Sequence, residues 1–230
     1  MTPGIPPPLP ALATAMRVDV WSDVVCPWCY LGKRRLEAAI AGLDWGDEIE
    51  VHWRAYLLDP GAPLEPQELK PVIERKYGPG AFDGMVRRLT ALGAEAGIEF
   101  RFDRAQRANS VSALRLLAWA AETERLAVAD QLHDRLFRAY FTDGDNIADV
   151  ASLTTWAEEV GLDRALAAEA LGGQAGGDQV AADLEEAADR QITGVPAFVI
   201  DGKFMIPGAQ DVETIQAILE RARAKRAAAS

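Results

Sequence analysis

The sequence predicts an α/β fold that opens with a strand–helix–strand unit, closes with a strand–strand–helix unit, and carries a large all-helical insertion between them. At both ends of the chain, β-branched and alternating segments indicate strands, and each end also carries a helical pattern. Helical periodicity is almost continuous from 61 to 190. The predicted boundaries are a disordered Pro-rich extension at 1–15, an α/β domain at 16–60 and 191–230, and the insertion at 61–190.

The opening unit is predicted from three consecutive segments. Residues 17–23 and 49–56 alternate apolar and polar side chains and contain many β-branched and aromatic residues, as strands do. The helix predicted at 27–41 begins with Pro27, because a missing N–H costs little at the first helical position. Apolar residues continue one face of this helix: Leu31, Leu36 and Ile40.

The closing unit contains a predicted hairpin. Asp201-Gly202 is a tight-turn dipeptide between strands predicted at 196–200 and 203–206, and a helix at 212–225 follows. Glycine-rich breaks divide the insertion. Its helices are predicted at 67–77, 81–96, 110–122, 127–141, 150–160, 163–171 and 179–190, with a brief extended piece at 98–102.

Composition limits the classes of function. The 230 residues are 49% hydrophobic and 26% charged, which is enough for a substantial core and excludes disordered and collagen-like classes. The 24 basic and 35 acidic residues give a formal charge of −11 without a dense basic stripe, so neither nucleic acid nor a membrane surface is an expected partner. Without heptads or an exposed apolar stripe, monomer and homodimer both remain open.

The N-terminal segment bears on the compartment. Five prolines fall within 1–15, no positive charge precedes the apolar run at 9–15, and no run approaches transmembrane length. We therefore expect a cytoplasmic protein without a secretory signal. Met16 directly precedes the first strand, so translation from Met1 and from Met16 both remain open.

The motif Cys26-Pro27-Trp28-Cys29 contains the only two cysteines and lies between the first strand and the first helix. A cysteine at a helix start meets unsatisfied N–H groups and the positive end of the helix dipole, which favour its thiolate form. Cys29, one turn inside, is expected to be more buried and less ionised. The spacing predicts redox chemistry in which Cys26 is the nucleophile and Cys29 resolves the mixed disulfide.

Two other uses of a cysteine pair are less favoured. A zinc site needs four ligands, and only His52 and His133 remain as nitrogen donors, isolated from the cysteines and from each other, so no metal is predicted. A structural disulfide across so short a loop removes little chain entropy, and a chain of this length does not need one.

The order of these features resembles the thioredoxin superfamily, because a βαβ unit with a cysteine pair at its helix start precedes a hairpin introduced by Gly194-Val195-Pro196. The long helical insertion is similar to that of the DsbA-like branch. Several runs resemble FrnE-type thiol–disulfide oxidoreductases: Ser22-Asp23-Val24-Val25-Cys26-Pro27-Trp28-Cys29, Trp53-Arg54-Ala55-Tyr56, Arg107-Ala108-Asn109-Ser110 and Pro207-Gly208-Ala209-Gln210. The resemblance covers nearly all of 17–221.

This resemblance implies a cis peptide bond between Val195 and Pro196 beside the cysteine pair. Gly194, Val195 and Pro196 would bind substrate, with the Val195 backbone free to pair with an extended chain. For an isolated Gly-Val-Pro, a proline that starts an edge strand is the alternative. Trp28 would offer the substrate a flat apolar surface.

Asn109 is a further substrate-binding candidate from the resemblance, and an N-cap of the following helix is the alternative. Relatives commonly carry a histidine where Leu114 stands, so its role is not transferred. The same branch includes 2-hydroxychromene-2-carboxylate isomerases and kappa-class glutathione transferases, which typically carry serine at the place of Cys26.

Asp19 and Asp23 are candidates for a proton relay to Cys29, since both lie on or just after the strand that leads to the motif. The alternatives are a solvent-facing strand position for Asp19 and a turn residue for Asp23. For Lys33-Arg34-Arg35 we expect an exposed helix face rather than a role in stabilising a thiolate. Core packing is expected for the aromatic residues near the motif, which are Trp21, Tyr30 and Trp53.

Three classes of function follow. We favour a thiol–disulfide oxidoreductase or isomerase that binds no cofactor and exchanges disulfides with protein or small-molecule thiols. The second class is a glutathione-dependent isomerase or transferase with glutathione as co-substrate and a small aromatic or electrophilic substrate. The third is a binding module with inert cysteines. The sequence leaves open the physiological substrate, the direction of electron flow and the recycling partner.

Overall fold

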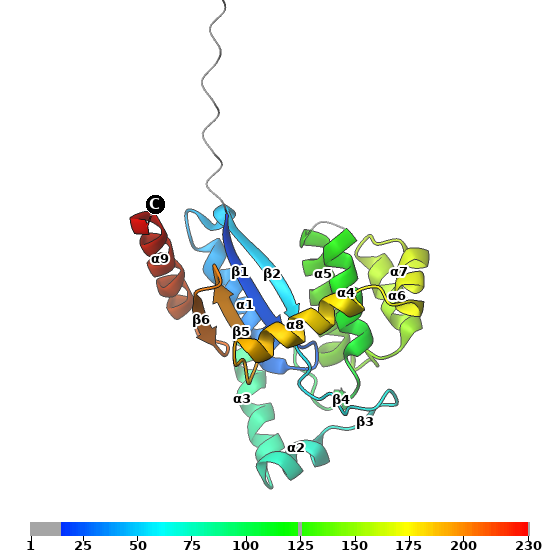
Figure 1. Ribbon diagram of the computed structural model, residues 1–230. Helices are drawn as coiled ribbons and strands as arrows, with labels where there is room; N and C mark the ends of the chain where they lie inside the picture. The colour runs from blue at the N-terminus through cyan, green and yellow to red at the C-terminus, as the bar shows by residue number, and fades with distance from the viewer. Residues whose placement is uncertain (1–14, 124–125, 230) are drawn as a thin grey trace, which may run out of the picture.

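The centre of the computed structural model, which describes residues 15–123 and 126–229, is a four-stranded sheet (Figure 1). Its strands are β1 (Met16–Ser22), β2 (Ile49–Ala55), β5 (Ala197–Ile200) and β6 (Phe204–Pro207). The spatial order is β2-β1-β5-β6, with β1 parallel to β2 and the other neighbours antiparallel. The predicted opening and closing units therefore share one sheet. The extension predicted at 1–15 lies, except for Ala15, outside the described residues.

Helices α1 (Pro27–Ala41) and α9 (Val212–Ala229) complete the α/β domain, and a 3₁₀ turn, η1 (Gly46–Glu48), precedes β2. No helix within the described ranges combines the length and the apolar character needed to cross a membrane. The insertion contains α2 (Lys70–Tyr77), α3 (Ala81–Glu95), α4 (Val111–Thr123), α5 (Leu126–Arg138), the π-helical turn η2 (Ala139–Asp143), α6 (Val150–Glu159), α7 (Arg164–Gly172) and α8 (Gly177–Asp189).

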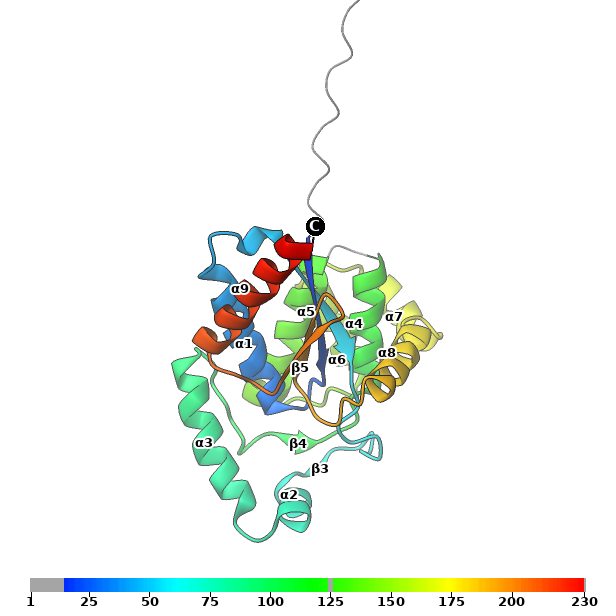
Figure 2. The same ribbon diagram turned by 60° about the vertical axis from the view of Figure 1, so that its left-hand side comes forward.

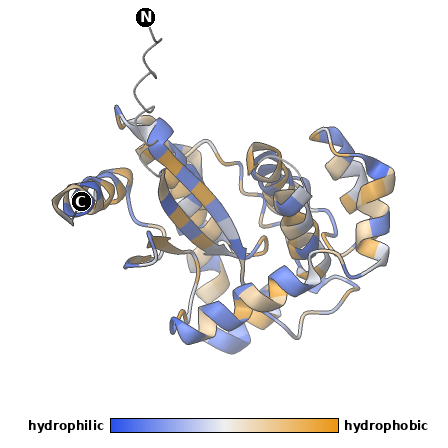
Figure 3. Cartoon of the chain, turned by 45° about the horizontal axis from the view of Figure 1, so that its top comes forward, coloured by the Kyte–Doolittle hydropathy of each residue, from blue (hydrophilic) through white to orange (hydrophobic). Residues whose placement is uncertain are grey.

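The sheet is covered on both faces, by α1 and α9 on one side and by α8 on the other (Figure 2). Val18 and Val20 pack toward α1 and α9, whereas Trp21 packs beneath α8 and donates its indole N–H to the Asp183 carbonyl at 2.9 Å. Neighbouring residues of a strand point to opposite faces. Figure 3 shows the resulting alternation of hydrophilic and hydrophobic residues along the strands.

A second core lies inside the insertion and extends to the cysteine motif. Cys26, Cys29 and Leu31 belong to the same buried cluster as the insertion's helices. Fully buried members from the insertion include Leu116, Leu132, Leu136, Phe137 and Phe141. The start of α1 therefore lies where the α/β domain meets the insertion.

Two predicted elements of the insertion are wrong. The helix predicted at 67–77 starts only at Lys70, because Pro71 stands in its first turn and a proline ring blocks a helix from extending further toward its N-terminus. Gln67–Glu68 instead forms β3 and pairs with β4 (Gln106–Arg107). The extended piece predicted at 98–102 is not a strand. The insertion is thus helical apart from one short ribbon.

Candidate functional site

Cys26 is the N-cap residue of α1, with extended backbone angles (φ −94°, ψ 112°), and Pro27 begins the helix. The Cys26 carbonyl accepts the backbone N–H groups of Cys29 at 3.0 Å and Tyr30 at 3.3 Å, which places the second cysteine one turn inside. Both thiols are free. Only 3% of Cys26 and 1% of Cys29 is exposed, so both sulfur atoms are largely shielded from solvent.

The loop before β5 brings Val195 and Pro196 to the cysteine pair. The predicted cis peptide bond between them is confirmed. The Cys26 thiol donates to the Val195 carbonyl oxygen across 3.6 Å, although the two residues are 169 positions apart. Gly194 lies in the same loop and is exposed.

Gly32 allows this loop to approach α1. A Cβ at this buried position would lie 2.9 Å from Cγ of Pro196 and 3.3 Å from Cζ of Phe198. We expect Gly32→Ala to lower the free energy of unfolding by about 1–3 kcal/mol, because overpacking outweighs the helix propensity gained. Urea unfolding measures the change.

Gly84→Ala in α3 is the matched control, since a Cβ there meets nothing within 4 Å. It should stabilise the protein by about 0.5–1 kcal/mol. A Gly32→Ala protein as stable as Gly84→Ala would contradict the close packing of α1 on Pro196.

Cys29 is held as a thiol. Burial, together with the hydrogen bond and charge of Cys26, raises the pKa of Cys29 well above its usual value. The Asp23 backbone N–H and the Ser22 hydroxyl lower this pKa, but they do not offset burial. The resolving cysteine of the predicted pair therefore needs a group that removes its proton.

Asp23 is fully buried, and the hydrogen bonds of its carboxylate are with groups other than that thiol. It accepts the backbone N–H of Leu58 at 2.8 Å and of Val25 at 3.4 Å, and it is hydrogen-bonded to Ser110. Burial raises the pKa of Asp23 to about 6, and these hydrogen bonds lower it only in part. Among the described residues, none of the contacts of this carboxylate is with Cys29.

Asp23 should make stability depend on pH. With the pKa of Asp23 raised from 3.8 to about 6 in the folded protein, the folded state holds a proton that the unfolded state has lost. The free energy of unfolding therefore falls as pH rises through this window, by about 3 kcal/mol at most. In Asp23→Asn this decline should be absent, so urea unfolding at pH of about 4 to 7 should show the variant gaining on wild type as pH rises. Parallel pH profiles would contradict the burial of a titrating Asp23.

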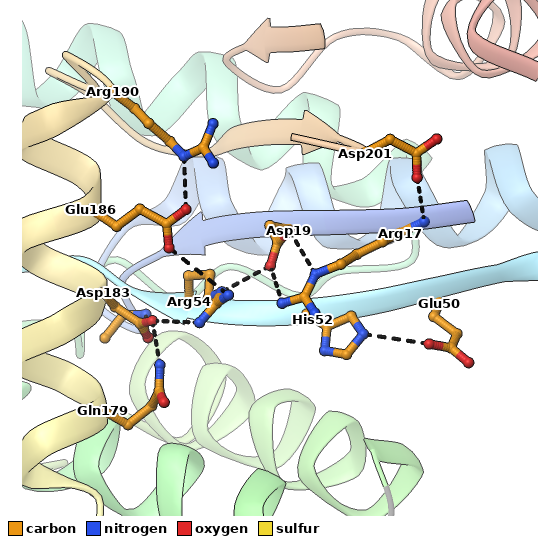
Figure 4. A network of polar contacts seen from close by, with 11 residues as sticks. Arg17, Asp19, Glu50, His52, Arg54, Gln179, Asp183, Glu186, Arg190 and Asp201 are labelled. Carbon is orange, nitrogen blue, oxygen red and sulfur yellow. Dashed lines mark hydrogen bonds and ion pairs between the residues drawn. The ribbon is translucent and has the colours of Figure 1, made fainter. Parts of the chain in front are cut away.

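Asp19 occupies a network of ion pairs on the α8 side of the sheet (Figure 4). Its oxygens accept from Arg17 at 2.7 and 2.8 Å and from Arg54 at 2.8 Å. Burial raises the pKa of Asp19, but the two guanidinium groups outweigh it, and the net pKa is lowered. A carboxylate kept ionised in this way is a poor proton relay, and Asp19 is 8% exposed rather than solvent-facing.

The hydrogen bonds of Asn109 and the ring contact of Trp28 involve residues other than the two cysteines. The Asn109 side chain accepts the Val111 N–H at 3.0 Å, which satisfies a backbone donor at the start of α4. It also donates to the Ala62 carbonyl at 2.9 Å, which ties the loop at Ala62 to α4. The Trp28 ring is partly exposed, and the Arg88 guanidinium of α3 lies 5.0 Å from its centroid. The core role expected for Trp21 agrees with its full burial.

The prediction that Lys33 is on an exposed helix face is wrong. Its side chain is 0% exposed, and it pairs with Glu37, with Asp130 at 2.8 Å and with Asp134 at 3.4 Å. The partner acids on α5 are about 100 positions away, so helical periodicity around Lys33 gave no sign of them. These three acids are the cluster within the described ranges that best suits a metal ion, but Lys33 already supplies their cation.

The sequence did not single out Ser22 and His133 for catalysis. The Ser22 hydroxyl hydrogen-bonds to the Cys29 sulfur and lies 3.5 Å from Nε2 of His133. Ser22 could have been found as the residue that ends the strand before the motif. His133 is 111 positions further on, within an ordinary amphipathic helix, and no sequence pattern links it to the cysteines.

Comparison with known proteins gives matches over nearly the whole chain. A family model, the DSBA-like thioredoxin domain, matches residues 17–220. The uncharacterized protein YwbO of Bacillus subtilis (strain 168) is 30% identical over 213 residues, which cover 92% of this chain and 99% of YwbO. The crystal structure of a probable DsbA oxidoreductase from Streptomyces coelicolor is 34% identical, with a TM-score of 0.84, and the match covers 91% of this chain and 90% of that one.

The fold is also shared with the cytosolic disulfide reductase DsbM of Pseudomonas aeruginosa, at 18% identity and a TM-score of 0.64, over 90% of this chain and 98% of that one. The family model includes the sheet, the insertion, the cysteine pair and the cis-proline loop. With Cys26 and Cys29 in place at the start of α1, the chain belongs to the family of DsbA-like oxidoreductases built on the DSBA-like thioredoxin domain.

Proposed function

We propose that this protein is a thiol–disulfide oxidoreductase or isomerase in which Cys26 reacts with the substrate and Cys29 resolves the intermediate. The carrying observation is the position of the Cys26 sulfur, 3.6 Å from the Val195 carbonyl of the cis-proline loop. Cys29 lies one turn deeper, and burial raises its pKa. It therefore stays protonated while Cys26 reacts with the substrate. This arrangement supports two thiol–disulfide exchanges in sequence, the first by Cys26 and the second by Cys29.

In the reducing direction, the Cys26 thiolate attacks one sulfur of a substrate disulfide. The substrate S–S bond breaks, and its other sulfur leaves and takes up a proton. Cys29, once deprotonated, then attacks Cys26 in the mixed disulfide. This forms the Cys26–Cys29 disulfide, releases the second substrate thiol, and transfers two electrons from protein to substrate. The oxidising direction uses the same intermediate in reverse.

Substrate would bind against the exposed part of the cis-proline loop and the partly exposed ring of Trp28. Gly194 leaves open space beside the loop, since a Cβ there would meet nothing within 4 Å. The Arg88 guanidinium over the Trp28 ring adds a positive charge to this rim. This combination suits an extended peptide or a small disulfide with an acidic group nearby.

Glutathione is the thiol that we propose as co-substrate for returning the pair to its reduced form, and the cytoplasm is the proposed compartment. The relative from Pseudomonas aeruginosa is named a cytosolic disulfide reductase and has a structure with GSH, which supports both proposals.

Insulin reduction driven by dithiothreitol tests the proposed function. We expect the protein to accelerate insulin precipitation well above dithiothreitol alone and to leave a chlorodinitrobenzene unconjugated in the presence of glutathione. Conjugation or isomerisation without insulin reduction would instead favour a glutathione-dependent enzyme acting on a small molecule. Neither activity would favour a binding module.

A further inference from the structure

A cavity of about 340 Å³ lies beside the edge strand β2. Its polar side includes Arg54, Gln179 and Asp183, which Figure 4 shows together on β2 and α8. Its apolar side comes from α4, where Leu114 and Leu117 face it. The volume accommodates several water molecules at about 30 Å³ each, and the polar side offers them hydrogen-bond partners.

Ser22 and His133 also line this cavity, and they connect it to Cys29. The Ser22 hydroxyl hydrogen-bonds to the Cys29 sulfur, and the same hydroxyl lies 3.5 Å from Nε2 of His133. This second distance is long, but hydrogen bonds of catalytic groups are often long before the reacting complex forms. Both side chains are buried, at 2% exposure for Ser22 and 1% for His133.

The imidazole of His133 is held in one orientation. Its ring stacks on Phe137, with 4.5 Å between centroids and 19° between planes, and meets Trp53 edge-on at 4.5 Å. With Nε2 directed at Ser22, Nδ1 is the remaining polar atom, and it has no hydrogen-bond partner among the described residues. A buried and unpaired ring nitrogen is costly unless it exchanges hydrogen bonds with the cavity.

His133 is neutral in this setting. Burial, and then the charge of Lys33 on α1, lowers the pKa of His133 well below its usual value. Two acids of the surrounding elements are already paired, Asp130 with Lys33 at 2.8 Å and Asp183 with Arg54 at 2.8 Å. A neutral imidazole has one N–H and one free lone pair, so it can accept a proton at one nitrogen while releasing one from the other.

We propose that Ser22 and His133 form a proton relay that carries the Cys29 proton to this cavity. The Cys29 S–H bond breaks and its proton passes to the Ser22 oxygen, while the Ser22 proton passes to Nε2 of His133. The Nδ1 proton of His133 passes to solvent water that enters the cavity, so the imidazole changes tautomer and gains no charge. The Cys29 thiolate then attacks Cys26, and the departing substrate thiolate takes a proton from solvent.

This relay rests on the proposed disulfide exchange and deepens it, because it supplies the deprotonation that the buried Cys29 needs. It also assigns to Ser22 the role that the sequence suggested for Asp19 or Asp23. In the proposed relay Ser22 exchanges a proton with the Cys29 sulfur itself, whereas His133 acts through Ser22.

Reaction of the reduced protein with dithiobis-nitrobenzoate separates the two steps. Attack by Cys26 releases the first thionitrobenzoate, and resolution by Cys29 releases the second. We expect Ser22→Ala and His133→Gln to leave the first release within about twofold of wild type and to slow the second by about 10- to 100-fold. Glutamine can still hydrogen-bond to Ser22 but cannot relay a proton. Leu117→Val, on the apolar wall, should change neither release.

Rescue distinguishes a relay from a structural role. In His133→Ala, imidazole added to the solution should enter the enlarged cavity and restore much of the second release, and it should not do so in Ser22→Ala. A second release in His133→Gln that is as fast as in the wild-type protein overturns the relay. So does a slow second release in His133→Ala that imidazole does not restore. Loss of the first release in the wild-type protein would instead contradict the proposed function.

Discussion

Cys26→Ser should reduce insulin at the rate of dithiothreitol alone, whereas Cys29→Ser should still attack the substrate and stop at the mixed disulfide. The reason is that Cys26 faces Val195 of the cis-proline loop, while Cys29 is buried one turn deeper and held as a thiol. The rate of insulin reduction above the dithiothreitol background should therefore fall by at least about 10²-fold in Cys26→Ser, as expected when a nucleophile is lost.

The two variants control for each other, because each replaces one buried sulfur in the same helix with an oxygen. Unequal folding is checked by comparing their urea unfolding. Full insulin-reducing activity in Cys26→Ser would contradict the assignment of Cys26 as nucleophile.

Arg54→Met should lower the free energy of unfolding by about 3–5 kcal/mol, as expected when one partner of a buried ion pair is removed. The Arg54 guanidinium donates to Asp183 at 2.8 Å and to Asp19 at 2.8 Å (Figure 4). The Asp183 side chain is only 3% exposed, and burial raises its pKa, so without Arg54 the carboxylate keeps only the Ala55 N–H and Gln179. Urea unfolding at neutral pH measures the loss.

Arg164→Met serves as the control, since the Arg164 and Glu158 side chains are 52% and 58% exposed and 3.4 Å apart. Exposed pairs contribute little to stability, so this variant should unfold at the wild-type urea concentration. If Arg54→Met also unfolded there, the network between β2 and α8 would not be a stabilising one.

Local signals account for the parts of the fold that the sequence predicted best. Helix α1 runs from Pro27 to Ala41 as predicted, because proline defines its start. The Asp201-Gly202 turn also formed, with positive φ at both residues. By contrast, Gln67–Glu68 became a strand only by pairing with Gln106–Arg107, about 40 positions away, which no local pattern reveals.

The site residues likewise divide into those with a local sequence signal and those that depend on distant partners. Cys26, Cys29 and Pro196 were found because their motifs are short and have a fixed order along the chain. Lys33 was misplaced, and Ser22 and His133 were not linked, because each depends on a partner about 100 positions away on another element. Asp19 looked like a relay in the sequence because Arg54, its partner on the neighbouring strand, is specified only by the register of β1 and β2.

Trapping of the mixed disulfide tests the central claim most directly. The Cys29→Ser protein would be mixed with a peptide that contains one disulfide, quenched by alkylation, digested and analysed by mass spectrometry. The account predicts a stable adduct joined through Cys26, which the wild-type protein resolves and does not accumulate. An adduct absent from Cys29→Ser but present on Cys29 in Cys26→Ser would contradict it.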